Sequence, residues 1–313
     1  SFLCIIVCSK YLIALYERGK FMKHLFIINP KAGKEKALQL IPEIEKEFKN
    51  TNEEFIIEIT ERAGHATELV RKYVSRENYR VYAVGGDGTL NEVLNGMINS
   101  ESCLGVIPSG SGNDFIRSLY KGKLPRNIIR DTINGDIKPI DLAKVDDRYF
   151  INISSIGIDA EVVNNAKSIK RCPFISGKIA YILSAIITIF MYKYRDIQLT
   201  IDSKEIKIKN TLLALANGKY YGGGMKVAPD ADPQDGLFDI CAIEKLSRAK
   251  MFILFPKLIK GEHHQIEEVT FYKGKKVTIN SKEEVTVNID GEIVKRKNVT
   301  FEIIPRGVRF IMP

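Results

Sequence analysis

Three glycines within four residues mark the stretch of this 313-residue chain whose residue types best suit a chemical role. The apolar run Val81–Val84 before them is typical of a buried strand, and apolar residues recur at helical spacing after them. A strand-to-helix turn aims backbone N–H groups and the positive end of a helix at one point, which suits a phosphate. A tight turn without a ligand is the alternative. The stretch reads Gly85-Gly86-Asp87-Gly88-Thr89-Leu90-Asn91.

Two further glycine-containing loops follow other predicted strands. Loops at the carboxyl ends of strands gather at one crevice in an open α/β sheet. Three such loops therefore favour a nucleotide phosphate site over three unrelated turns. Their spacing matches neither the G-x-G-x-x-G dinucleotide fingerprint nor the Walker P-loop. The earlier loop reads Asn29-Pro30-Lys31-Ala32-Gly33, and the later one, Pro108–Phe115, contains Ser111.

Two acidic clusters lie in the second half of the chain. In Asn288–Glu292, a glycine stands between Asp290 and Glu292, which predicts a hairpin tip that projects both carboxylates. A hairpin without a chemical role is the alternative. Asp232–Asp239 offers the hard oxygen ligands that Mg²⁺ takes. On its residues alone, this cluster predicts only a loop with an Asp-Gly turn.

The elements that must position these residues change in kind along the chain. Up to about residue 140, apolar strands alternate with helical patterns, which predicts a doubly wound, parallel α/β domain over residues 22–140. From residue 141 to 304, short strands follow one another and predict an all-β sandwich. The predicted first-domain strands are His24–Asn29, Phe55–Thr60, Val81–Val84 and Leu104–Ile107, and the helices are Glu35–Lys49, Ala66–Val74, Leu90–Ile98 and one from Phe115.

Two apolar stretches and the first residues need separate interpretation. Residues 1–21 look like an extension outside the fold, because the apolar run Phe2–Cys8 is too short to span a membrane; a weak anchor is the alternative. Ile179–Tyr192 is predicted to be a helix packed on the sandwich, or a border of an acyl-chain groove. Lys245–Lys260 mixes cations with an apolar run and suits contact with anionic lipid, or is an ordinary solvated helix.

Composition limits the classes of partner. A net charge of +9 favours nucleotides, anionic membranes or nucleic acid, and the lack of basic and aromatic interleaving argues against nucleic acid. The five cysteines fit neither a zinc site nor a disulfide framework, which is typical of a reducing cytoplasm.

Together, the three loops resemble those of the diacylglycerol kinase catalytic domain, and the resemblance extends from about Met22 to the last residue. It is strongest to soluble bacterial lipid kinases, and the glycine core is shared with NAD kinases. The resemblance implies that residues 305–313 return to the first domain. It implies ATP and Mg²⁺ as cofactors, with ATP contacted by all three loops, Thr60 and Ser111.

The resemblance also implies roles for the acidic residues. Glu292 would be the base that accepts the lipid hydroxyl proton, and Asp290 would orient it or help to bind a metal-bound water. On its residue type and position alone, Asp87 could act through a Mg²⁺-bound water, or else cap the helix expected from Leu90. A structural Mg²⁺ site would map to Asp232, Asp235 and Leu237.

The predicted function is therefore an ATP-dependent lipid kinase that converts diacylglycerol to phosphatidic acid. Such a protein would be cytoplasmic, with transient contact at the inner membrane surface. A NAD kinase is one alternative, although a second T-P-T-G-S-T-like motif is missing from the sequence. A catalytically silent lipid- or nucleotide-binding regulator is another. The sequence leaves open the lipid, the nucleotide and the homodimer that is common in the family.

Overall fold

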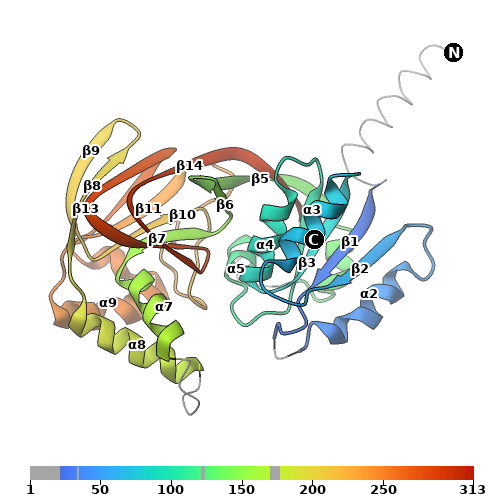
Figure 1. The fold of residues 1–313 in the computed structure, drawn as a ribbon, viewed down its shortest axis with the longest axis horizontal. Helices are drawn as coiled ribbons and strands as arrows, with labels where there is room; N and C mark the ends of the chain where they lie inside the picture. Colours follow the sequence, from blue (N-terminus) through green and yellow to red (C-terminus); the bar gives the residue numbers. More distant parts are fainter. Residues whose placement is uncertain (1–21, 34, 121–123, 170–176) are drawn as a thin grey trace. The chain divides into compact units, whose positions relative to one another are not determined.

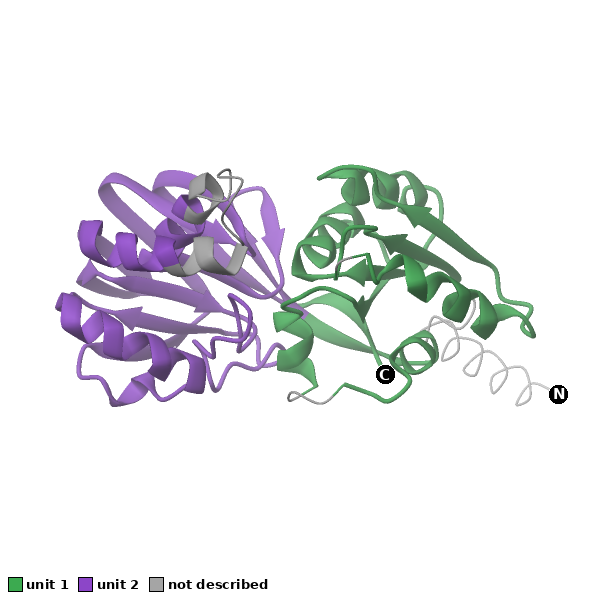
Figure 2. Ribbon diagram, turned by 90° about the horizontal axis from the view of Figure 1, so that it is seen from below, with its two compact units in different colours: residues 1–140, 306–313 green, residues 141–305 purple. Residues whose placement is uncertain are grey.

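The computed structural model of this protein describes residues 22–33, 35–120, 124–169 and 177–313 (Figure 1). The predicted extension at residues 1–21 lies outside the described residues. The chain divides into two compact units (Figure 2). One unit comprises the residues up to 140 together with 306–313, and the other comprises 141–305.

The first unit is built on a parallel sheet in which β1 (Lys23–Ile28) and β3 (Tyr79–Gly85) are neighbours. The chain leaves β1 for β2 (Phe55–Ile59) on one side and then returns to β3 and β4 (Cys103–Pro108) on the other. The direction of winding therefore changes between β1 and β3, where open α/β sheets bind ligands. The predicted doubly wound sheet is confirmed. Its helices are α2 (Ile41–Phe48), α3 (His65–Val74), α4 (Asp87–Met97), α5 (Asp114–Leu119) and α6 (Ile128–Ile133).

Two predicted helix starts in this unit are wrong. The helix expected from Glu35 begins as α2 only at Ile41, after the 3-10 turn η1 (Leu38–Leu40). Glu35 has a φ of 70°, which a right-handed helix cannot accommodate. The helix expected from Leu90 begins three residues earlier, so part of the glycine-rich stretch is itself helical.

The second unit is a two-layered antiparallel β-structure with an added layer of helices. One layer runs in the order β12–β11–β10–β7–β13, and β13 also pairs with β14 and β8. Strand β5 pairs with β14 and β6, and β9 pairs with β8. Their bounds are β5 (Asp136–Val145), β6 (Arg148–Phe150), β7 (Ile153–Gly157), β8 (Arg195–Ile201), β9 (Lys204–Asn210), β10 (Leu212–Ala216), β11 (Phe238–Ile243), β12 (Val269–Gly274), β13 (Lys276–Ile289) and β14 (Glu292–Met312).

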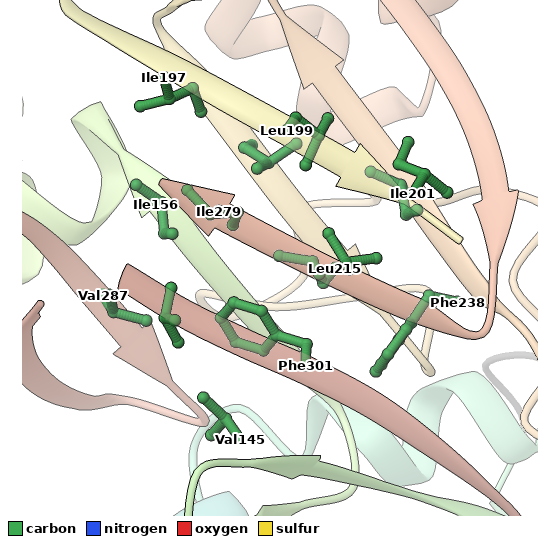
Figure 3. Packing of buried hydrophobic residues seen from close by; sticks show 14 of the residues in the cluster. Val145, Ile156, Ile197, Leu199, Ile201, Leu215, Phe238, Ile279, Val287 and Phe301 are labelled. Atoms are coloured by element: carbon green, nitrogen blue, oxygen red, sulfur yellow. The ribbon is translucent and has the colours of Figure 1, made fainter. Parts of the chain in front are cut away.

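Strand β10 explains how the layers stack. Leu213 and Leu215 point into the core between the two β-layers, which Figure 3 shows around Leu199 of β8 and Phe301 of β14. Leu212, Ala214 and Ala216 point the other way, into a second apolar core beneath the helices. Because both faces are covered, β10 is apolar and buried at every position.

The described residues of this unit form three helices and one 3-10 turn. The helix predicted at Ile179–Tyr192 is present as α8 (Gly177–Met191), and α9 (Arg248–Lys260) follows β11. Helix α7 (Ile158–Ile169) was not predicted, and η2 (His263–Gln265) follows α9. Within the described residues, every helix is too short or too polar to span a bilayer.

Candidate active site

The three glycine-containing loops meet at the carboxyl ends of β1, β3 and β4. The Asn29 side-chain amide donates a hydrogen bond to Thr89 Oγ1 at 3.1 Å, which joins the first loop to the second. The backbone N–H groups of Ser109 and Gly110 both donate to the Gly85 carbonyl, at 2.9 and 3.1 Å, which joins the third loop to the second. The loops therefore form one hydrogen-bonded surface, as the sequence predicts.

This surface encloses a pocket of about 500 Å³. Most of the residues predicted to contact a nucleotide line it, whereas Gly85, Asp87, Leu90 and Asn91 do not. Leu90 and Asn91 are instead buried under the loop. The lining residues that were predicted are Asn29, Pro30, Lys31, Ala32, Gly33, Thr60, Gly86, Gly88, Thr89 and Ser111.

The sequence prediction missed another part of this lining. Glu61, Arg62 and Ala63 follow β2, and Glu92 comes from α4. Arg62 is paired with Glu68 at 2.6 Å, and Glu92 accepts a hydrogen bond from the Ala66 N–H at 3.2 Å. Glu61, Arg62 and Ala63 carry no recognisable motif, and only the position of β2 next to β1 could have indicated them. Glu92 directly follows the glycine-rich stretch on α4.

The charge of the pocket suits phosphate at the first loop. Lys31 is exposed, and its ammonium group forms no ion pair within the described part of the chain. Its backbone N–H donates to Asn29 Oδ1 at 3.0 Å, which fixes the loop just after β1. The pocket therefore offers a cation and the start of α4 to one ligand.

Asp87 does not cap its own helix. It is the first residue of α4, the N-cap is Gly86, and this N-cap makes no side-chain hydrogen bond. The Asp87 carboxylate instead accepts a hydrogen bond from the Phe115 N–H at 3.3 Å, in the first turn of α5. The predicted capping role is therefore wrong for α4, and Asp87 links the second loop to the third.

The D-G-E segment forms the predicted hairpin between β13 and β14. Asp290 and Gly291 are its two turn residues, with φ values of 44° and 94°, as a type I′ turn requires. The Asp290 carboxylate accepts hydrogen bonds from the N–H groups of Ile151 and Ile153, at 3.0 and 2.9 Å. Asp290 therefore anchors the hairpin to the start of β7.

Glu292 is the first residue of β14, and its side chain is half exposed. Its carboxylate forms an ion pair with Arg148, which comes from β6. Sequence reasoning missed Arg148, because it lies 144 residues away along the chain. The pair orients the Glu292 carboxylate without burying it, so the carboxylate keeps access to a reacting group.

The second acidic cluster forms a compact turn. Asp232 accepts a hydrogen bond from the Gln234 N–H, and Asp235 accepts one from the Leu237 N–H at 3.0 Å. The Lys273 ammonium lies 2.7 Å from Asp235 and 3.2 Å from Asp239. Among the described residues, no group of three or more His, Cys, Asp or Glu side chains is arranged for a metal.

The donor chemistry of this turn nonetheless fits Mg²⁺. Carboxylate and backbone carbonyl oxygens are the ligands Mg²⁺ prefers, and the ion keeps several waters of its own. Asp232 and Asp235 supply carboxylates, while Leu237 can supply only its backbone carbonyl. Buried Asp141, which sequence reasoning also missed, accepts a hydrogen bond from the Gly236 N–H at 2.7 Å and holds the turn in place.

A buried polar chain leads away from the D-G-E hairpin. The Gly291 N–H donates to Asn288 Oδ1 at 2.9 Å, and the Asn288 amide donates to Ser155 Oγ at 3.4 Å. Ser155 in turn donates to the carboxylate of Asp159. Burial raises the pKa of Asp159 to about 6, although the Ser155 hydrogen bond opposes this shift.

This shift predicts a specific dependence of stability on pH. The folded pKa of Asp159 lies above the unfolded value of 3.8, so its protonated form is favoured in the folded state. The unfolding free energy should therefore fall by about 3 kcal/mol in all as the pH rises from about 4 through 6. Asp159→Asn should remove this loss, so urea unfolding should show a stabilised variant at pH 8 and little change at pH 4.

Exposed Asp136 provides the matched control for this experiment. Asp136→Asn should leave the unfolding free energy unchanged at both pH values. Asp159→Asn could instead destabilise the protein equally at pH 4 and pH 8. The fold would then prefer the ionised carboxylate as a hydrogen-bond acceptor, and the assigned direction of the pKa shift would be wrong.

Comparisons with known proteins match nearly the whole chain. Residues 23–145 match the model of the diacylglycerol kinase catalytic domain, and residues 152–312 match that of the YegS C-terminal NAD kinase beta sandwich-like domain. A diacylglycerol kinase of Bacillus subtilis is 31% identical over 293 residues, which cover 92% of this chain and 95% of that protein. One from Staphylococcus carnosus is 32% identical over 272 residues, covering 85% and 87%.

Solved structures agree with these matches. The crystal structure of a putative diacylglycerol kinase from Bacillus anthracis superposes with a TM-score of 0.74 at 28% sequence identity. The match covers 94% of this chain and 98% of that one. The likeness therefore includes both the α/β unit and the β-sandwich unit.

Proposed function

Because the chain belongs to the diacylglycerol kinase family, we propose that it is a lipid kinase that transfers the γ-phosphate of ATP to the hydroxyl of diacylglycerol, giving phosphatidic acid. The observation that carries this proposal is the pocket on which all three glycine-containing loops converge. Relatives named as diacylglycerol kinases match more than nine-tenths of the chain, so the proposal concerns the whole protein.

The pocket residues bind the nucleotide phosphates in this proposal. Backbone N–H groups at Gly86 and Gly88 and the Lys31 ammonium provide the positive potential, and Thr60 and Ser111 close the sides. The absence of a side chain at Gly86 and Gly88 lets the backbone approach a phosphate closely. Phosphoryl transfer needs such positioning and charge stabilisation more than covalent help from the protein.

The D-G-E hairpin supplies the base. Glu292 accepts the proton of the lipid hydroxyl as the hydroxyl oxygen attacks the γ-phosphorus and the bond to ADP breaks. Asp290 is a positioning residue, because its carboxylate is occupied by the backbone of Ile151 and Ile153. Arg148, which comes from β6, orients the Glu292 carboxylate through their ion pair.

Mg²⁺ is the metal proposed for this protein, at two places. At the nucleotide, the ion would supply positive charge to the phosphates. Asp232, Asp235 and the backbone carbonyl of Leu237 would hold a second ion, in competition with Lys273. Mg²⁺ should therefore raise the melting temperature of the wild type but not of Asp235→Asn. An equal shift of the melting temperature in both proteins would show that Mg²⁺ does not bind at this turn.

The test of the proposed function is transfer of labelled γ-phosphate into lipid. Purified protein, Mg²⁺ and labelled ATP are incubated with mixed micelles of total bacterial lipid, or with NAD. Label in phosphatidic acid is expected, and none in NADP. Label in NADP alone would make the protein a NAD kinase. ATP binding without any labelled product would make it a silent regulator, and both results would overturn the proposal.

The proposed place of action follows from the substrate. Diacylglycerol lies in a bilayer, whereas ATP is a solute of the cytoplasm. The protein therefore acts in the cytoplasm, at the inner surface of the membrane.

A further inference from the structure

Helices α8 and α9 together present an apolar face to solvent. Nine of the twelve large hydrophobic side chains that are exposed in the described residues lie on these two helices. The rings of Phe190 and Phe252 lie 6.1 Å apart, so the exposed side chains of the two helices are continuous. The α8–α9 face consists of Leu183, Ile186, Ile187, Phe190, Met191, Phe252, Ile253, Phe255 and Ile259.

The fold does not need these side chains for its core. The opposite sides of the same helices already pack on the sheet through Ile189, Met251, Leu254 and Leu258. A helix on the surface of a globular protein normally turns polar residues to water. Phe190 is instead 63% exposed and Met191 73% exposed. Such a contiguous apolar patch marks an interaction surface.

The charges around this face identify the partner. Neither α8 nor α9 contains an Asp or Glu, whereas α9 contains Arg248, Lys250, Lys257 and Lys260. Glu268 neutralises Lys250, but the partner of Lys257 is the uncharged Gln265. Lys260 is exposed next to Ile259 in the last turn. Apolar side chains bordered by uncompensated cations complement an anionic lipid bilayer.

The apolar surface also continues inward from this face. A cavity of about 50 Å³ lies between α7, α8, α9 and β10, and its lining is apolar except at Asp159 and Tyr221. Phe255 lines this cavity and is also 39% exposed on the α8–α9 face. Hydrocarbon from a bilayer would therefore meet apolar side chains both at the surface and beneath it.

We propose that the α8–α9 face docks this protein on an anionic lipid bilayer. Phe190 and Phe252 insert into the boundary between headgroups and acyl chains, while Lys257 and Lys260 contact the anionic headgroups. This inference rests on the proposed function, since it names the surface by which a lipid kinase reaches its substrate.

Vesicle binding tests the docking surface directly. The wild type is sedimented with vesicles of phosphatidylcholine alone, or of phosphatidylcholine and phosphatidylglycerol in a ratio of about 7:3. Tight binding to the anionic vesicles only is expected. Phe190→Ser with Phe252→Ser should lower the partition coefficient at least about ten-fold. Lys257→Gln with Lys260→Gln should lower it about ten-fold or more and weaken its salt dependence.

Ile59→Ser is the matched control, because Ile59 is an exposed isoleucine on β2 of the first unit. It should bind vesicles as the wild type does. The melting temperature of each variant verifies that it is folded. Vesicle binding by the phenylalanine variant at the wild-type level would overturn the proposal. So would a wild-type dimer that this variant converts to a monomer, because a second copy would then cover the face.

Activity assays separate failure of docking from failure of the proposed function. With short-chain diacylglycerol dispersed as monomers, the phenylalanine variant should retain the wild-type rate, and with vesicles its rate should fall with binding. If the wild type bound anionic vesicles but labelled no lipid, the docking proposal would be supported and the proposed kinase activity would be refuted. If the phenylalanine variant phosphorylated vesicle-borne lipid at the wild-type rate, the docking proposal would be refuted and the proposed kinase activity would be supported.

Discussion

Glu292→Gln should reduce phosphoryl transfer to lipid by about 10²–10⁴-fold, the range that a positioned general base contributes. Glutamine keeps the shape of the side chain but cannot accept the hydroxyl proton. The hairpin should survive, because it is held by Asp290 and by Asn288 rather than by Glu292. ATP affinity should not change, since Glu292 is not part of the pocket lining. Single-turnover transfer and equilibrium nucleotide binding measure the two effects separately.

Glu283→Gln is a closely matched control. Glu283 lies in β13 of the second unit, is exposed, and forms an ion pair with an arginine, Arg195. Loss of a surface ion pair of this kind changes stability by about 0–1 kcal/mol. The control should therefore transfer phosphate at the wild-type rate. If the control lost as much activity as Glu292→Gln, loss of a negative charge rather than loss of a proton acceptor would explain the effect. Glu292 could then no longer be assigned as the base.

Gly110→Ala should have the second large effect, on nucleotide binding. A Cβ at Gly110 would lie 2.4 Å from the Cα of Gly86 and 3.0 Å from its nitrogen. The shortest contact is with the backbone, so moving the nearby Asn113 side chain cannot relieve it, and the second and third loops must separate. Overpacking of this kind costs about 1–3 kcal/mol of stability. The melting temperature should fall, and ATP affinity measured by calorimetry should fall by at least about ten-fold.

Gly88→Ala distinguishes loop packing from ligand contact. A Cβ at Gly88 meets no protein atom within 4 Å, yet Gly88 lines the pocket. Alanine is favoured over glycine in a helix by roughly 0.5–1 kcal/mol, so α4 should tolerate or prefer it. The melting temperature should be unchanged or higher while ATP affinity falls. Wild-type ATP affinity in Gly88→Ala would mean that no phosphate approaches this backbone.

Local sequence signals were sufficient to predict the loops and the turn that carry the candidate site. Alternating apolar runs and glycines placed three loops at the ends of neighbouring parallel strands, and ten predicted residues line the resulting pocket. The Asp-Gly pair predicted the two-residue turn, because only a few residue types accept two successive positive φ values. Such features depend on residues that are adjacent in sequence.

The errors concern contacts between distant segments. Asp87 could be assigned to its own helix from local spacing, but its partner, Phe115, is 28 residues away. Arg148 and Glu292 meet only through the pairing of separate strands. The residues after β2 line the pocket because β2 neighbours β1, which no motif encodes. Helix α7 was not predicted, although its apolar residues recur at helical spacing, because it lies among predicted short strands.

Strand β14 has a consequence for biosynthesis. It begins at Glu292 and ends with Phe310 paired to Leu104 of β4, where Phe310 also packs on Phe115 at 5.9 Å. The first unit to be translated therefore lacks a strand until residues 306–313 have left the ribosome. During that interval β4 has an unpaired edge of the kind that promotes aggregation. Fragments that stop before residue 306 should thus need chaperones, and the first unit cannot be excised as a continuous segment.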